Sequence, residues 1–237
     1  MSNEIPLNQV YMVDKTLKEY PDLAEIKKNY EKYCLEDVKW HKFGRSYDCS
    51  VSLLQVDFED KIVCELGARD SIFSSYLTKY VKKVYASDTF IGWGDLGDLK
   101  YWDTLWKKFA FNPERHVSEF QDMRKLSYPD NSMDIVVSFS AIEHIPEDGD
   151  ILSAKEMGRV CKPEGFVIIG TDICRNHIWH RGGYFYDEKS FFERIVKQSE
   201  CEIIGDYDFR FEESDRSFVD GLESTSLIFV LRKKVKK

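Results

Sequence analysis

Two acidic residues and a glycine have a spacing suited to binding a cofactor that contains adenosine. Glu65 ends the apolar run Ile62-Val63-Cys64, and Gly67 follows two residues later. Asp88 closes the next apolar segment, 21 residues after Gly67. An acid about 20 residues beyond a glycine turn is placed to accept hydrogen bonds from ribose hydroxyls. Glu65 adds a negative charge that suits a cationic ligand, so the three residues together indicate an adenosine-type cofactor site.

The elements that must hold these residues alternate between strands and helices. Strands are expected at 62–65, 83–87, 116–120, 133–138, 166–171, 201–209 and 225–232, with helices at 71–80, 101–109, 149–161 and 188–198. The nearly continuous apolar run at 133–138 is typical of a central parallel strand that is buried on both faces. Alternation of this kind predicts an α/β fold with a doubly wound sheet of seven strands.

Two later motifs narrow the class of protein. Residues 129–138 read PDNSMDIVVS and lead into Ile142-Glu143-His144-Ile145, and residues 156–166 read EMGRVCKPEGF. Together with 62–67, in this order, they resemble the class I S-adenosylmethionine-dependent methyltransferases from about residue 50 to the C-terminus. The resemblance implies a Rossmann-like sheet, mostly parallel with an antiparallel last strand. It also implies S-adenosylmethionine as cofactor and S-adenosylhomocysteine as product.

The resemblance assigns further cofactor contacts. Asp122 is expected to accept from the adenine amino group, Met123 to pack on the ring, and Ser138 to lie near the methionyl part. Glycine allows the backbone to approach a ligand closely. We interpret Arg45 either as a partner of the methionyl carboxylate or as an ordinary surface residue. The predicted cofactor-binding set is Glu65, Gly67, Ala68, Asp88, Asp122, Met123, Ser138 and Arg45.

His144 is a candidate general base. It follows the fourth expected strand, at the edge where open α/β sheets bind ligands. An oxygen acceptor must lose its proton in or before the transition state, and histidine suits that role near neutral pH. The Glu-His-Ile motif also occurs in members of the resembling family with different acceptors. Both interpretations, base and structural loop residue, therefore remain open.

The segment after the fifth expected strand is rich in histidine, arginine and aromatic residues. Such a loop is suited to binding an acceptor, because arginine holds carboxylate or phosphate in a bidentate manner. We predict that His177, Arg181 and Tyr184 bind the acceptor and that Asp172 and His180 join His144 in catalysis. The alternative is a polar surface loop. Asp172, His177 and His180 are also of metal-ligand types, but their spacing is not diagnostic, and we assign no metal.

Composition limits the function further. The net charge of −8 argues against a protein that grips nucleic-acid phosphates. The six cysteines form no Cys-x-x-Cys pair, and no run of about 18 apolar residues is present. We therefore expect a cytoplasmic protein without a membrane span. Residues 1–50 are predicted to form a helical lid or accessory segment, and residues 51–237 a single methyltransferase domain.

The predicted activity is methylation of a small molecule or glycan, with O-methylation of a sugar hydroxyl first. An amino sugar or another metabolite methylated on nitrogen is one alternative. A second is a non-catalytic regulatory protein that binds S-adenosylmethionine, since Arg69 and Ser71 stand where the family often has glycines. A nicotinamide dehydrogenase shares the strand, glycine and acid pattern, but its fingerprint requires two further glycines.

Overall fold

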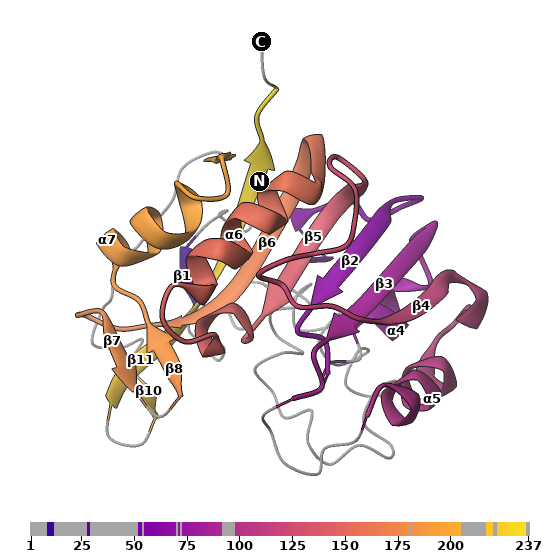
Figure 1. Ribbon diagram of the computed structural model, residues 1–237, viewed down its shortest axis with the longest axis horizontal. Helices are drawn as coiled ribbons and strands as arrows, with labels where there is room; N and C mark the ends of the chain where they lie inside the picture. Colours follow the sequence, from indigo (N-terminus) through magenta and orange to yellow (C-terminus); the bar gives the residue numbers. More distant parts are fainter. Residues whose placement is uncertain are drawn as a thin grey trace.

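The computed structural model describes residues 9–11, 28, 52–53, 55–69, 71, 73–91, 98–180, 182–204, 217–219 and 222–235. Arg45 and Arg181 of the predicted site lie outside these residues, as does most of the predicted helical segment 1–50. Within the described part, helices flank a twisted, mostly parallel sheet (Figure 1). No helix of the described residues is long and apolar enough to cross a membrane.

The sheet has the expected strand directions. The continuous path runs β1 (Gln9–Tyr11), β11 (Leu222–Lys233), β6 (Cys161–Ile173), β5 (Met133–Phe139), β2 (Ile62–Leu66), β3 (Lys83–Asp88) and β4 (His116–Phe120). From β6 to β4 all neighbours are parallel, whereas β11 lies antiparallel to β6. Among the described residues β9 (Cys201–Ile203) and β10 (Ser217–Val219) also pair with β11. The prediction of a doubly wound sheet with an antiparallel last strand is confirmed.

One core lies on each face of the sheet. On one face, α4 (Phe73–Leu77) and α5 (Leu99–Phe109) bury Phe73, Trp102 and Trp106 with the strands. On the other, α6 (Gly149–Val160), α7 (Glu188–Phe191) and the π-helix η3 (Phe192–Val196) bury apolar side chains against the sheet. Alternate residues of β5 enter opposite cores, as expected for a central parallel strand.

The helix and strand boundaries near residue 161 differ from the prediction. The expected break at Lys162-Pro163-Glu164-Gly165 is a bulge at the start of β6, because Met133 pairs with Cys161 while Ile135 already pairs with Phe166. Gly165 is required there, since an added Cβ would lie 2.6 Å from the Asp134 carbonyl oxygen. The bulge therefore connects α6 to the sheet without a separate loop.

Two features lie outside the expected elements. Residues 9–11 form β1, antiparallel to β11, within the segment for which a helix was predicted. The loop after β6 forms a hairpin of β7 (Ile178–His180) and β8 (Gly183–Phe185). Short 3-10 helices, η1 (Pro113–Arg115) and η2 (Ile142–His144), precede β4 and follow β5.

Candidate active site

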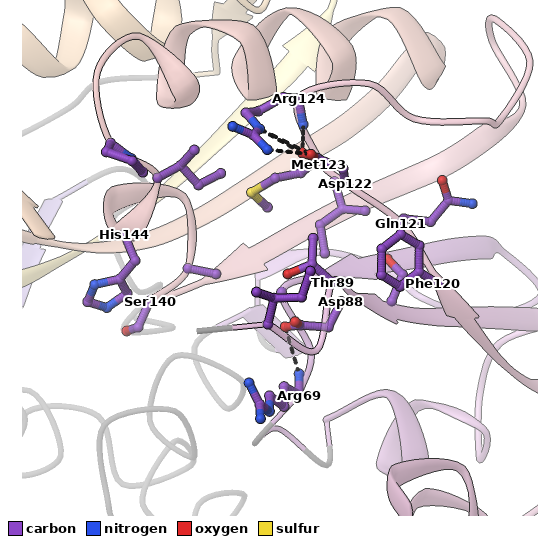
Figure 2. A pocket seen from close by; sticks show the side chains of 17 residues that line it. Arg69, Asp88, Thr89, Phe120, Gln121, Asp122, Met123, Arg124, Ser140 and His144 are labelled. Carbon is purple, nitrogen blue, oxygen red and sulfur yellow. Dashed lines mark hydrogen bonds and ion pairs between the residues drawn. The ribbon is translucent and has the colours of Figure 1, made fainter. Parts of the chain in front are cut away.

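A cavity of about 580 Å³ opens at the carboxyl ends of β2, β3, β4 and β5. This is the edge at which doubly wound sheets bind their ligands. Figure 2 shows the lining side chains, which come from the ends of these strands and from the segments that follow them. The lining includes Gly67, Arg69, Asp88, Thr89, Ile91, Phe120, Gln121, Asp122, Met123, Arg124, Ser140, Ala141 and His144.

Gly67 brings two cavity walls together. Its φ is +71°, which favours glycine, and an added Cβ would lie 2.3 Å from the Ala141 Cβ. The turn after β2 therefore packs directly against the segment after β5. The sequence indicated a close backbone approach to a ligand at this glycine. In the structure the group that approaches Gly67 closely is the Ala141 side chain.

Glu65 and Ala68 are not among the residues that line the cavity. Glu65 is fully buried, and its carboxylate Oε2 accepts a hydrogen bond from the Ser74 backbone N–H at 3.0 Å. The Ala68 N–H donates to the Ser87 carbonyl at 2.9 Å. In these positions both residues stabilise the connection from β2 to α4 beneath the site, and their contact with a cofactor stays a prediction.

Asp88 lies where the spacing placed it, at the end of β3 on the cavity wall. One carboxylate oxygen accepts from the Phe90 N–H at 2.7 Å, and the other from the Arg69 N–H at 3.4 Å (Figure 2). These backbone donors orient the carboxylate, which as an acceptor-only group has further lone pairs for hydroxyl donors. Ile91 and Phe120, 71% and 58% exposed, add apolar surface to the lining.

Asp122 and Met123 both reach the cavity, as the resemblance implied. Arg124, which the sequence analysis did not single out, binds the Asp122 carboxylate through Nε and through Nη2, the latter at 2.6 Å (Figure 2). This bidentate pair holds the pKa of Asp122 below its ordinary value. An adenine amino group would share Asp122 with Arg124.

Ser138 lies deeper than the prediction requires. It is fully buried in β5 opposite Ile169, and its Oγ has no hydrogen-bond partner among the described residues. Ser140, two residues later, lines the cavity instead, with a φ of +45°. The strand extends one residue beyond the predicted end at 138, which explains the displacement.

His144 ends η2 and lines the cavity, where its Nδ1 lies 2.9 Å from the Gly182 carbonyl oxygen. A carbonyl only accepts hydrogen bonds, so Nδ1 carries the proton in this contact. In the neutral ring the basic lone pair is then on Nε2. The contact also joins the two predicted catalytic regions, the segment after β5 and the loop after β6.

The predicted acceptor residues His177 and Tyr184 do not line the cavity, and neither do the predicted catalytic residues Asp172 and His180. The His177 ring stacks on Tyr184, with centroids 5.1 Å apart, and the Tyr184 hydroxyl donates to the Glu147 carbonyl at 2.7 Å. His180 pairs with Gly183 in the hairpin, and Asp172 lies in β6. Among the described residues no group of three or more His, Cys, Asp or Glu is placed to hold a metal ion.

Comparisons with known proteins bear directly on this site. Residues 64–169, which contain the strand ends around the cavity, match the family model described as "Methyltransferase domain". The chain carries a methyltransferase domain. The resemblance to the class I S-adenosylmethionine-dependent methyltransferases is therefore confirmed. No curated protein matches the chain.

Solved structures share the fold of this methyltransferase. One is the 1,6-didemethyltoxoflavin-N1-methyltransferase of Burkholderia thailandensis, with bound 1,6-didemethyltoxoflavin and S-adenosylhomocysteine. It has a TM-score of 0.61 and 14% identity over 92% of this chain and 90% of that one. The YcgJ protein of Bacillus subtilis has a TM-score of 0.60 and 9% identity, covering 80% of this chain and 99% of that one. At these identities the likeness concerns the fold alone.

The cofactor of the methyltransferase is S-adenosylmethionine. The described residues suit it chemically, because Asp88 offers oriented carboxylate oxygens for ribose hydroxyls and Ile91, Phe120 and Met123 offer apolar surface for a planar ring. A ligand site of this kind is mostly apolar with a few placed polar groups. Ile91 and Phe120 were missed from the sequence, although Phe120 ends the strand predicted at 116–120 and Ile91 lies four residues beyond the one predicted at 83–87.

Proposed function

We propose that this methyltransferase methylates an oxygen of a small molecule or glycan, with a sugar hydroxyl as the leading acceptor. The observation that supports the proposal is the position of His144 on the cavity wall with Nδ1 hydrogen-bonded to the Gly182 carbonyl. The neutral ring then presents its basic nitrogen at Nε2. A hydroxyl acceptor needs a group of this kind, since it is a poor nucleophile until its proton is removed.

The residues divide the reaction between binding and proton transfer. When bound, S-adenosylmethionine supplies an electrophilic methyl group on a sulfonium with a neutral thioether as leaving group. Asp88 would hold the ribose of the cofactor, and such positioning accounts for much of the rate of methyl transfer. His144 Nε2 takes the proton of the acceptor hydroxyl as its oxygen bonds to the methyl carbon.

The side chains of the β7–β8 hairpin are evidence in favour of a polar, ring-shaped acceptor. Trp179, Tyr184 and His177 form a cluster of aromatic rings in which the indole lies edge-on to Tyr184 at 4.7 Å. Trp179 is 42% exposed, so part of its surface is accessible to a ligand.

The buried free thiols of Cys64, Cys161 and the other described cysteines support a reducing, cytoplasmic location.

A nitrogen acceptor is the second candidate, favoured by the fold shared with the N1-methyltransferase of Burkholderia thailandensis. A neutral amine attacks through its own lone pair and does not need a base before the carbon–nitrogen bond forms. His144 is therefore expected to matter much more for a hydroxyl than for an amine. This difference separates the two candidates experimentally.

The test is a methyl-transfer assay with matched acceptors. Nucleotide sugars and glycan fragments with hydroxyl groups are compared with the corresponding amino sugars, using labelled S-adenosylmethionine. Turnover of the hydroxyl series, reduced about 100-fold or more in His144→Gln, is the expected result, since a positioned base contributes about 10²–10⁴-fold. Turnover of amino sugars alone, unaffected by the substitution, would replace the proposal with N-methylation. Cofactor binding without turnover on either series would favour a regulatory protein.

A further inference from the structure

We infer that the β7–β8 hairpin is the positioning element of His144, and that Gly182 and Gly183 set its tautomer and the direction of its Nε2. This inference rests on the proposed function, in which His144 is the base. Gly182 and Gly183 act through the imidazole and are positioning residues. The hairpin itself is not part of the cavity lining.

The Gly182 carbonyl selects the protonated nitrogen. Its oxygen lies 2.9 Å from His144 Nδ1. A neutral imidazole has one donor and one acceptor nitrogen, and the hydrogen bond made by one nitrogen determines the role of the other. The reversed tautomer would place the Nδ1 lone pair against the carbonyl lone pairs. The contact therefore makes Nε2 the nitrogen that accepts the substrate proton.

Gly183 leaves the space that this arrangement needs. The residue is buried, and an added Cβ would lie 3.0 Å from His144 Nδ1 and 3.2 Å from Cε1. Distances of this kind force a ring to move by a few tenths of an ångström or to rotate. By contrast, a Cβ on Gly182 would meet nothing within 4 Å. The position of the His144 ring therefore requires glycine at 183 but not at 182.

A separate set of contacts fixes the hairpin to the segment that follows His144. The Tyr184 hydroxyl and Arg194 Nη2 both donate to the Glu147 carbonyl, at 2.7 and 2.8 Å. The Arg194 guanidinium also lies over the Tyr184 ring, 5.0 Å from its centroid. The hairpin and the 3-10 helix that carries His144 therefore have a common anchor.

A second, buried anchor lies just beyond the hairpin. The Tyr186 hydroxyl donates to Asp150 Oδ2 at 3.0 Å, and Arg194 Nη2 binds Asp150 Oδ1 at 2.7 Å. Tyr186 and Asp150 are both fully buried. Since breaking a buried hydrogen-bonded ion pair is strongly unfavourable, this network keeps the spacing between the Gly182 carbonyl and His144 constant. These contacts make the hairpin a rigid support for the His144 ring.

Nitrogen-15 NMR of the histidine-labelled protein without ligand tests the inference directly, because the two ring nitrogens have different shifts when protonated and unprotonated. The chain has five histidines, and His144→Gln identifies the signal of His144. At a pH where the ring is neutral, His144 is expected in the Nδ1–H form. In Gly183→Ala this form is expected to be lost or mixed with the Nε2–H form.

The control variant is Ile178→Ala, on the same hairpin and 42% exposed, which is expected to leave the His144 tautomer unchanged. Thermal unfolding and S-adenosylhomocysteine affinity report whether Gly183→Ala remains folded. Should Gly183→Ala not fold, Tyr184→Phe, which removes the donor to the Glu147 carbonyl, is expected to broaden or mix the two forms. An Nε2–H form in the unsubstituted protein, or an unchanged tautomer in both variants, would overturn the inference.

Kinetics separate this inference from the proposed function. With a hydroxyl acceptor, Gly183→Ala is expected to lower kcat about tenfold or more and to alter the acidic limb of its pH profile, with little change in KM, because a displaced base loses part of its contribution of about 10²–10⁴-fold. If NMR shows the Nδ1–H tautomer but no hydroxyl acceptor is methylated, the positioning role of the hairpin would stand and the proposed acceptor would be refuted. O-methylation that is insensitive to both His144→Gln and Gly183→Ala would refute the positioning role.

Discussion

Replacing Gly67 with alanine tests how the cavity is built. Two effects are expected to oppose the substitution. The φ of +71° disfavours a side chain by about 1–2 kcal/mol. The new Cβ would also lie 2.3 Å from the Ala141 Cβ, far inside the contact distance of about 3.5–4.0 Å. Overpacking of this kind typically costs about 1–3 kcal/mol, so Gly67→Ala should lower the unfolding free energy by about 2–5 kcal/mol.

A double-mutant cycle divides the two effects. Ala141→Gly removes the atom that the new Cβ meets, and the Ala141 Cα is then 3.7 Å away. The double variant should therefore regain about 1–3 kcal/mol relative to Gly67→Ala and retain the backbone term. Gly182→Ala is the matched control, because its φ is +85° but nothing lies within 4 Å of its added Cβ. It should lose about 1–2 kcal/mol, with no gain from Ala141→Gly.

Urea unfolding with a constant m-value provides the free energies, and calorimetry with S-adenosylhomocysteine provides the binding of the cofactor product. Since Gly67 and Ala141 both line the cavity, the single variant should also bind more weakly, and the double variant should recover part of the affinity. Additive free energies for Gly67→Ala and Ala141→Gly would refute the reasoning. They would mean that the turn after β2 does not pack against the segment after β5.

Three further substitutions test other parts of the site and the core. Asp88→Ala should weaken S-adenosylhomocysteine binding by about 1–3 kcal/mol in calorimetry, and unchanged affinity would remove its ribose role. Burial lowers the pKa of His116 from 6.5 to about 4, so the unfolded chain takes up the proton first as the pH falls. The unfolding free energy should fall by up to about 3 kcal/mol between these values, and urea titrations of His116→Gln should lack that slope. Arg124→Ala should raise the pKa of Asp122 in a carbon-13 NMR titration, whereas an unaltered value would exclude the ion pair.

The central strands β2, β3 and β5 were predictable because each contains a short run of apolar residues. Asp88 ends β3, Asp122 lies two residues beyond the end of β4, and both line the cavity. Parallel strands place their carboxyl ends at one edge, so an acid at or just beyond a strand end is expected near the site. Prediction was less accurate at Ser138, because the strand continued for one more residue and exposed Ser140 instead.

Side-chain direction could not be predicted from position alone. Glu65 closes a strand as Asp88 does, yet its carboxylate points to the N–H of Ser74 and is buried. Arg124 gave no signal in the sequence, since its contact with Asp122 depends on a turn that only the structure describes. Long-range contacts such as His144 with Gly182 join residues 38 positions apart and likewise leave no local pattern.

Calorimetric titration of S-adenosylmethionine and S-adenosylhomocysteine into the purified protein tests the central claim most directly. The account predicts binding of both at one site, with affinity on the order of micromolar and clearly weaker binding in Asp88→Ala. It also predicts that reduced nicotinamide cofactors do not compete. Absence of heat beyond dilution for both ligands, or equal affinity in Asp88→Ala, would contradict the assignment of this cavity as the cofactor site.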